Sequence, residues 1–145
     1  MSKTGTGWWL DTIGRVPLLT PAQEIELGSR VQQWLNHPDG PDDCPRNIKR
    51  SGERAKRQFV AANLRLAVSY VTKNCNRLIT TNGNVQDDLI QAANLGVIRA
   101  VEKYDPSRGY RFSTYAYWWI RQSVNRWIDQ CAKTIRMPIH DTGKL

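Results

Sequence analysis

Apolar residues recur every three or four positions through most of this chain, which is the spacing of helices buried on one side. The spacing predicts helices over Pro21–Leu35, over roughly 25 residues from Ser51, over Gln86–Tyr104, and from Thr114 to about Met137. No stretch alternates convincingly as a β-strand would. The pattern therefore predicts an all-α fold, a compact helical bundle with four main helices.

Capping and turn residues predict where these helices begin and end. Thr20 is placed to cap the first helix, with Pro21 at its first position and Gln23 completing a capping box. Ser113 is placed to cap the last helix. Three segments are expected to connect the helices: the proline-rich loop Asn36–Asn47, the polar connection Asn74–Asn84 around Asn82-Gly83, and the turn Asp105–Gly109.

The last predicted helix carries an unusual density of aromatic rings. At 100° per residue, one stripe is apolar and predicts the buried side: Ile120, Val124, Trp127, Ile128 and Cys131. The opposite side gathers rings, amides and a cation: Tyr115, Trp118, Trp119, Gln122, Asn125 and Arg126. Tyr117 lies near the flank of the buried stripe. Either a second helix covers the rings, or they form a surface that stacks unpaired bases. The mixture of rings with amides and a cation favours the base-stacking surface, because buried amides and cations without partners are costly.

The net charge of the chain also indicates a nucleic-acid partner. The chain has 145 residues and a formal net charge of +8, which favours a polyanion, with nucleic acid ahead of membrane. Part of this charge is a basic run that could equally be a solvated helix face: Lys49, Arg50, Arg54, Lys56 and Arg57. No apolar run is long enough to predict a transmembrane helix.

No motif of enzyme or metal chemistry is present in the sequence. The three cysteines and two histidines lie too far apart to predict a disulfide framework or a metal site: Cys44, Cys75, Cys131, His37 and His140. There is no glycine-rich phosphate loop and no nucleophile with a neighbouring base. We therefore predict a protein that is not an enzyme, needs no cofactor, and works in a reducing, cytoplasmic compartment.

Two long strings resemble one family closely. NLRLAVSYV at Asn63–Val71 and DLIQAANLGVIRAVEKYDPSRGYRFSTYAYWWIRQSVNRWIDQCAKTIRMPIH at Asp88–His140 resemble region 2 of sigma-70-type initiation factors of bacterial RNA polymerase. IGRVPLLTPAQEIELGSRVQ at Ile13–Gln32 resembles region 1.2 of the same family. The resemblance implies a tail and region 1.2 over residues 1–35, a linker over 36–50, region 2 over 51–140 and the start of region 3 over 141–145.

Two features narrow the resemblance within the family. No acidic segment like region 1.1 precedes region 1.2, and the linker is short, as in alternative or cyanobacterial-type members. Beyond the start of region 3, nothing in the chain resembles regions 3 and 4, so recognition of the −35 element is not expected in it.

The resemblance implies that the chain recognises and melts the promoter −10 element and captures flipped bases of the non-template strand. Three rings are expected to form the pocket for the −11 adenine, namely Tyr115, Trp118 and Trp119, with Tyr104, Asp105 and Arg108 at its rim. Asn63, Leu66 and Ser113 are expected to line a second pocket, for the −7 thymine. Gln122 and Asn125 correspond to positions that meet the duplex at −12.

The remaining implied contacts are with phosphates, flanking DNA and the polymerase. Phosphate contacts are expected from Lys103, Arg111, Arg121, Arg126, Lys133 and Arg136, although Arg121 lies nearer the core flank. His140 corresponds to a position near extended −10 DNA, and Trp9 and Leu10 to positions near the discriminator. Core RNA polymerase is expected to dock, through the coiled coil of its largest subunit (β′), on Asp88, Gln91 and Asn94. Where the family usually has a glutamate that contacts the polymerase, this chain has Ala92. Within the cytoplasm, the chain would then be associated with the nucleoid.

Two other function classes compete with this interpretation. One is a sigma-like interaction module that docks on polymerase or on an anti-sigma factor without opening DNA. The other is an enzyme that flips bases in order to modify them. The sequence lacks the zinc-ligand signature of base deaminases, and its complete set of aromatic residues favours binding of opened DNA.

Overall fold

The computed structural model describes residues 11–81 and 85–135 of the chain, and all regular structure in this part is helical. The four long helices are α2 (Pro21–Leu35), α3 (Arg46–Asn74), α5 (Gln86–Lys103) and α6 (Phe112–Ile135). A short helix, α4 (Asn76–Thr81), and a 3-10 turn, η2 (Pro106–Arg108), lie between them. The predicted all-α bundle with four main helices is confirmed.

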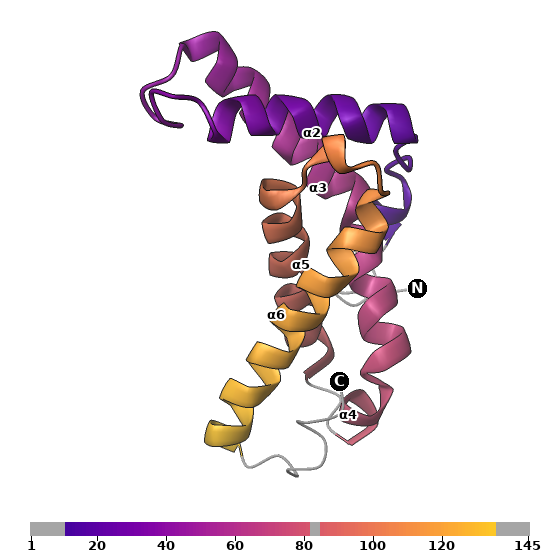
Figure 1. Cartoon of the computed structure of the whole chain (residues 1–145). Helices are drawn as coiled ribbons and strands as arrows, with labels where there is room; N and C mark the ends of the chain where they lie inside the picture. The colour runs from indigo at the N-terminus through magenta and orange to yellow at the C-terminus, as the bar shows by residue number, and fades with distance from the viewer. Residues whose placement is uncertain (1–10, 82–84, 136–145) are drawn as a thin grey trace.

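Helix α3 is the element on which the others pack (Figure 1). Its first half lies along α2 as one arm of a helical hairpin, and α5 packs along the rest. Helix α6 packs along α5, so that one of its sides meets the bundle. The core is shared among α2, α3, α5 and α6. Its centre is a cluster of three rings, in which Phe59 lies 4.6 Å from Phe112 and 5.8 Å from Tyr104 between ring centroids.

Helix α2 begins and ends where the sequence predicts. The Thr20 hydroxyl accepts a hydrogen bond from the Gln23 amide at 3.2 Å, and the Gln23 side chain accepts one from the Thr20 amide at 2.9 Å. This is the predicted capping box, with Pro21 at the first position. Two otherwise unpaired amides at the helix start are thereby satisfied.

The predicted starts of the two longest helices are wrong. Helix α3 begins at Arg46, within the segment expected to be a linker, because Pro45 supplies a fixed extended conformation directly before it. Helix α6 begins at Phe112, so Ser113 lies inside the first turn and is not the cap. The amide of Phe112 instead donates to the carboxylate of Glu24, which comes from α2. A partner so distant in sequence cannot be found from local capping patterns.

The connection predicted over Asn74–Asn84 also contains a helix. Helix α4 spans Asn76–Thr81, and Leu78 within it is buried in the core. Only Ile79 beside it also packs against the core. Two adjacent apolar residues carry no helical period, so the polar composition around them predicted a loop. Residues 82–84, including the predicted turn Asn82-Gly83, lie outside the described residues, as does the predicted end of α6 at Met137-Pro138.

Gly96 allows α5 and α6 to pack closely. A β-carbon at this position would lie 2.6 Å from the Ile120 α-carbon and 2.8 Å from the Trp119 carbonyl oxygen. Both are backbone atoms of α6, so a side chain here would push the two helices apart. The contact therefore helps to set the position of Trp119 and its neighbours on the exposed side of α6.

We expect Gly96→Ala to lower the free energy of unfolding by about 2 kcal/mol, within the usual cost of overpacking a core. The measurement is urea unfolding followed by circular dichroism. Gly14→Ala is the control, because a β-carbon at Gly14 meets no heavy atom within 4 Å. Equal stability of the two variants would show that α5 and α6 tolerate a wider separation.

Candidate nucleic-acid interface

Helix α6 buries one side and exposes the other, largely as its sequence predicts. Ile120, Val124 and Ile128 are buried, whereas Trp127 and Cys131 are only partly so. Phe112 and Ala116 extend the buried side toward the helix start. On the opposite side, three residues are exposed, namely Trp118, Gln122 and Arg126, and three are partly buried, namely Tyr115, Trp119 and Asn125. The described part of the chain places no second helix over Trp118, which remains 58% exposed.

The two adjacent tryptophans meet at a right angle. The ring centroids of Trp118 and Trp119 are 5.2 Å apart with an interplanar angle of 90°, and Tyr115 lies 6.4 Å from Trp119. The indole Nε1–H of Trp119 is buried and has no hydrogen-bond partner within the described residues. The corner between the indoles offers an exposed ring face next to a ring edge, which suits stacking of a planar base.

Tyr115 also faces a second surface, a hollow of about 680 Å³ between the end of α2, the end of α5 and the turn before α6. Its hydroxyl donates to the carbonyl of Lys103 at 3.2 Å. Asp105 and Arg108, the predicted rim residues, line this hollow. The Nε of Arg108 lies 3.6 Å from the Oδ2 of Asp105. Hydrogen bonds from the side chain and amide of Ser107 lower the pKa of Asp105.

Tyr104 does not belong to the predicted rim. Its side chain is 1% exposed, and its ring packs edge-on against Phe59 and Phe112 in the core. The hydroxyl donates to the carbonyl of Tyr110 at 2.8 Å, and burial raises the pKa of this phenol. A ring held in this way cannot reach a base, so the contribution of Tyr104 is to hold the turn that leads into α6.

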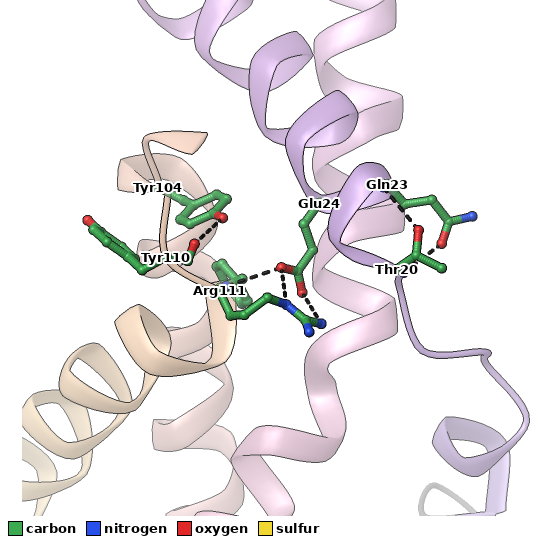
Figure 2. A network of polar contacts seen from close by, with 7 residues as sticks. Thr20, Gln23, Glu24, Tyr104, Tyr110 and Arg111 are labelled. Atoms are coloured by element: carbon green, nitrogen blue, oxygen red, sulfur yellow. Dashed lines mark hydrogen bonds and ion pairs between the residues drawn. The ribbon is translucent and has the colours of Figure 1, made fainter. Parts of the chain in front are cut away.

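Arg111, a predicted phosphate contact, pairs with a carboxylate of the protein (Figure 2). Its Nε lies 3.1 Å from Oε1 of Glu24, and its Nη2 lies 3.4 Å from Oε2. Glu24 is 4% exposed and also accepts the Phe112 amide at 3.2 Å. The hydrogen bonds and charge of Glu24 raise the pKa of Arg111. The sequence interpretation missed Glu24, because a glutamate in the first turn of a helix is ordinary and its partners lie 87 and 88 residues away.

The second predicted pocket is only partly formed by the predicted residues. A hollow of about 150 Å³ lies between α3 and α6, and Leu66, Tyr117 and Ser113 are among the residues that line it. Asn63 is not among them. It is 9% exposed, and its amide donates to the Phe59 carbonyl in its own helix at 2.9 Å. Tyr117 is 50% exposed and packs edge-on against Tyr70, so it lies on the α3 side of α6, away from Trp118.

The polar residues of α6 continue beyond the tryptophans. A shallow hollow of about 630 Å³ follows the helix, and the described residues that line it include Trp118, Gln122, Asn125 and Arg126. Arg121 lines the same hollow and is exposed, and its charge also acts on the buried Tyr70 of α3, so it lies near the core flank as expected. This run joins ring faces, amide groups and guanidinium groups along one side of a single helix.

The predicted polymerase-docking residues divide into two groups. Asp88 and Gln91 are exposed on α5, whereas Asn94 is 9% exposed and faces inward. Leu95, one position later, is 61% exposed and lies in the same helical row as Asp88 and Gln91. Asp88, Gln91 and Leu95 line a groove of about 810 Å³ between α5 and α6. Ala92 also lines this groove, whereas Asn94 does not. The helical spacing of the sequence could have predicted that Leu95, rather than Asn94, shares the exposed row of Asp88 and Gln91.

Several predicted contacts cannot be placed. The side chain of Lys133, all of Arg136 and His140, and the discriminator candidates Trp9 and Leu10 lie outside the described residues. Within the described ranges, no group of three or more histidine, cysteine or acidic residues is arranged to hold a metal ion. None of the described helices combines the length and apolar character needed to cross a bilayer.

Comparison with known proteins identifies the family. Residues 59–134, more than half of the chain, match the family model for sigma-70 region 2. The chain belongs to the sigma-70 family. Residues 6–36 match the model for region 1.2 of the same factors.

Several sigma factors are similar to nearly the whole chain. RNA polymerase sigma factor SigA4 of Synechococcus elongatus is 49% identical over 142 residues, which cover 95% of this chain and 44% of the relative. SigA2 of the same species is 42% identical, with 94% and 48% covered. The sigma-B factor of a Nostoc species is 39% identical, with 94% and 47% covered. The chain thus spans less than half the length of these relatives.

Proposed function

We propose that this chain is the part of a sigma factor that binds core RNA polymerase and opens promoter DNA at the −10 element. The observation that carries the proposal is the exposed Trp118, which stands on one side of α6 with Gln122 and Arg126. Stacking on an aromatic ring stabilises an unpaired base by about 1–3 kcal/mol, which offsets the cost of removing that base from the duplex. The residues from 51 to 140 would form the DNA-opening unit, and the residues before 36 would form region 1.2.

The −11 adenine of the non-template strand would bind at the corner of Trp118 and Trp119. Tyr115 joins this corner to the charged hollow, where Asp105 and Arg108 can meet the base edge and the adjoining phosphate. Gln122 is exposed about two helical turns after Tyr115 along α6. Its amide can make paired hydrogen bonds to a base edge at −12. Leu66 and Ser113 would contribute to the site of the −7 thymine.

Core polymerase would dock on the groove between α5 and α6. Asp88 and Gln91 offer polar contacts, and Leu95 adds an exposed apolar contact in the same row. The partner is expected to be the coiled coil of the largest polymerase subunit. Because the groove also reaches Trp119, docking and base binding share helix α6.

The proposal is tested by binding the chain, with and without core polymerase, to single-stranded −10 oligonucleotides. We expect a TATAAT-like non-template strand to bind more tightly than its complement, and the preference to depend most on the −11 adenine. Equal binding of both strands in both conditions would contradict sequence reading by this chain.

Arg126 is expected to contact phosphate rather than a base, because it is exposed at the polar end of the α6 face. Arg126→Ala should weaken binding to every single-stranded sequence alike. The slope of log K against log salt should become shallower by about 0.7, the value for one phosphate contact on a single strand. Fluorescence anisotropy over a salt series measures both effects, and a loss confined to TATAAT-like strands would contradict the assignment.

A further inference from the structure

A row of arginines runs along the outer side of the first half of α3. Arg46, Arg50, Arg54 and Arg57 recur at intervals of three or four residues, and all four are exposed. We call these four residues the arginine stripe. Gly52, Ala55 and Phe59 form the opposite, buried side of the same helix, which packs against α2. The stripe therefore faces directly away from the core. It lies on the arm that α2 and α3 form at the top of Figure 1.

The arginines of the stripe lack the ion pairs that their lysine neighbours make. Lys49 lies 3.8 Å from a carboxylate oxygen of Asp42, and Lys56 lies 3.7 Å from one of Glu102. No arginine of the stripe lies within 4.0 Å of a carboxylate oxygen in the part of the chain that the structure describes. Glu53 shares this side of the helix but forms no ion pair with any described residue. The stripe thus keeps most of its positive charge available to a partner.

This arrangement works against the stability of the helix. Like charges four residues apart, such as those of Arg46, Arg50 and Arg54, repel one another. The first turn of α3 has no acidic residue and no side-chain cap. The positive N-terminal end of the helix dipole therefore lies next to cationic side chains, which is unfavourable. An exposed row gains no packing energy in return. A polyanionic partner would relieve this repulsion.

We infer that the arginine stripe is a second DNA contact, which grips the phosphate backbone of double-stranded DNA without reading its sequence. The inference rests on the proposed function only in that the duplex would belong to the same promoter. From Arg46 to Arg57 the helix rises about 16 Å, a length over which one strand of a duplex carries about five phosphates. Guanidinium groups match phosphate oxygens in pairs.

The absence of rings favours a duplex over a single strand. Surfaces that bind single strands interleave cations with aromatic residues, as the exposed side of α6 does. No aromatic residue occurs between Arg46 and Arg57. The two surfaces therefore differ in chemistry: α6 suits opened bases, and the stripe suits paired DNA with its bases enclosed.

The test compares two double variants of the 145-residue chain that each remove two positive charges. Arg50→Gln/Arg54→Gln alters the stripe, and Arg15→Gln/Arg99→Gln alters two exposed arginines elsewhere. Fluorescence anisotropy with a labelled duplex of unrelated sequence is measured from 0.05 to 0.2 M salt. For the stripe variant we expect about tenfold weaker binding at low salt, and a log–log slope shallower by about 1.8, the value for two phosphate contacts on B-DNA. The control variant should keep the original slope.

Two further readouts separate the possible outcomes. The stripe variant should unfold at the same or a higher urea concentration than the original chain, and it should keep its preference for the non-template strand. Equal losses of duplex binding in both variants would overturn the inference, since net charge alone would explain them. Unchanged duplex binding with weakened binding to core polymerase would also overturn it, because the partner would then be an acidic protein surface. If duplex binding depends on the stripe but the chain shows no preference for the non-template strand, the proposed function is refuted and the inference about the stripe stands.

Discussion

Trp118→Ala is expected to remove most of the preference for adenine at −11 of the non-template strand. The ring is 58% exposed and meets Trp119 at 90°, so its loss takes away one wall of the proposed base site. Since one stacked ring contributes about 1–3 kcal/mol, the affinity ratio between strands with and without this adenine should fall about tenfold. Stability should change little, because the side chain is largely in solvent.

Two further variants make this result specific. Trp118→Phe keeps a ring and should restore part of the preference. Leu18→Ala removes an equally exposed apolar side chain, 64% exposed and outside the α6 surface, and should leave the ratio unchanged. Competition binding with oligonucleotides that differ only at −11 measures all three variants. If Leu18→Ala lowered the ratio as much as Trp118→Ala, the effect would be general and the base site would be wrongly placed.

Glu24→Ala is expected to cause the largest loss of stability, about 2–3 kcal/mol. The carboxylate is buried and bonds both the Arg111 guanidinium and the first amide of α6. Its removal leaves the buried Phe112 amide unpaired, at a cost of about 1–3 kcal/mol. The half-exposed Arg111 adds less, because water can solvate it.

The matched control for this prediction is Glu26→Ala on the same helix, where the side chain is exposed. It should change the free energy of unfolding by less than about 0.5 kcal/mol, as is usual for surface positions. Glu24→Gln keeps an acceptor for the Phe112 amide, so its loss should lie between those of the two alanine variants. Urea unfolding measures all three, and equal stability of the two alanine variants would show that the α2–α6 contact contributes nothing.

Local patterns predicted those parts of the fold that depend on neighbouring residues. The cap of α2 at Thr20 and Gln23 lies within one turn, and its two hydrogen bonds form as predicted. The division of α6 into a buried and an exposed side follows from 3.6-residue periodicity, and Trp118 lies on the exposed side. Both inferences needed only the residues of the element itself.

Three differences between prediction and structure involve partners from elsewhere in the chain. Ser113 has the chemistry of a cap, but Glu24 of α2 satisfies the start of α6. Tyr104 follows α5 directly, yet the rings of Phe59 and Phe112 draw it into the core. Arg111 is one of many cations in the sequence, and only the fold shows that it has a buried carboxylate partner. The family resemblance supplied Tyr104 as a DNA contact, and contacts across the bundle bury its ring.

Base capture by α6 is tested most directly by a nuclear magnetic resonance titration of the tryptophan indole N–H signals with −10 oligonucleotides. The signals are assigned by single Trp→Phe variants. We predict that the Trp118 and Trp119 signals shift with a TATAAT-like non-template strand and shift far less when −11 is cytosine. The Trp34 signal should stay in place with either strand, because its indole donates to the Pro41 carbonyl away from α6. Unchanged Trp118 and Trp119 signals at saturating oligonucleotide, or identical shifts with both strands, would contradict base capture by α6.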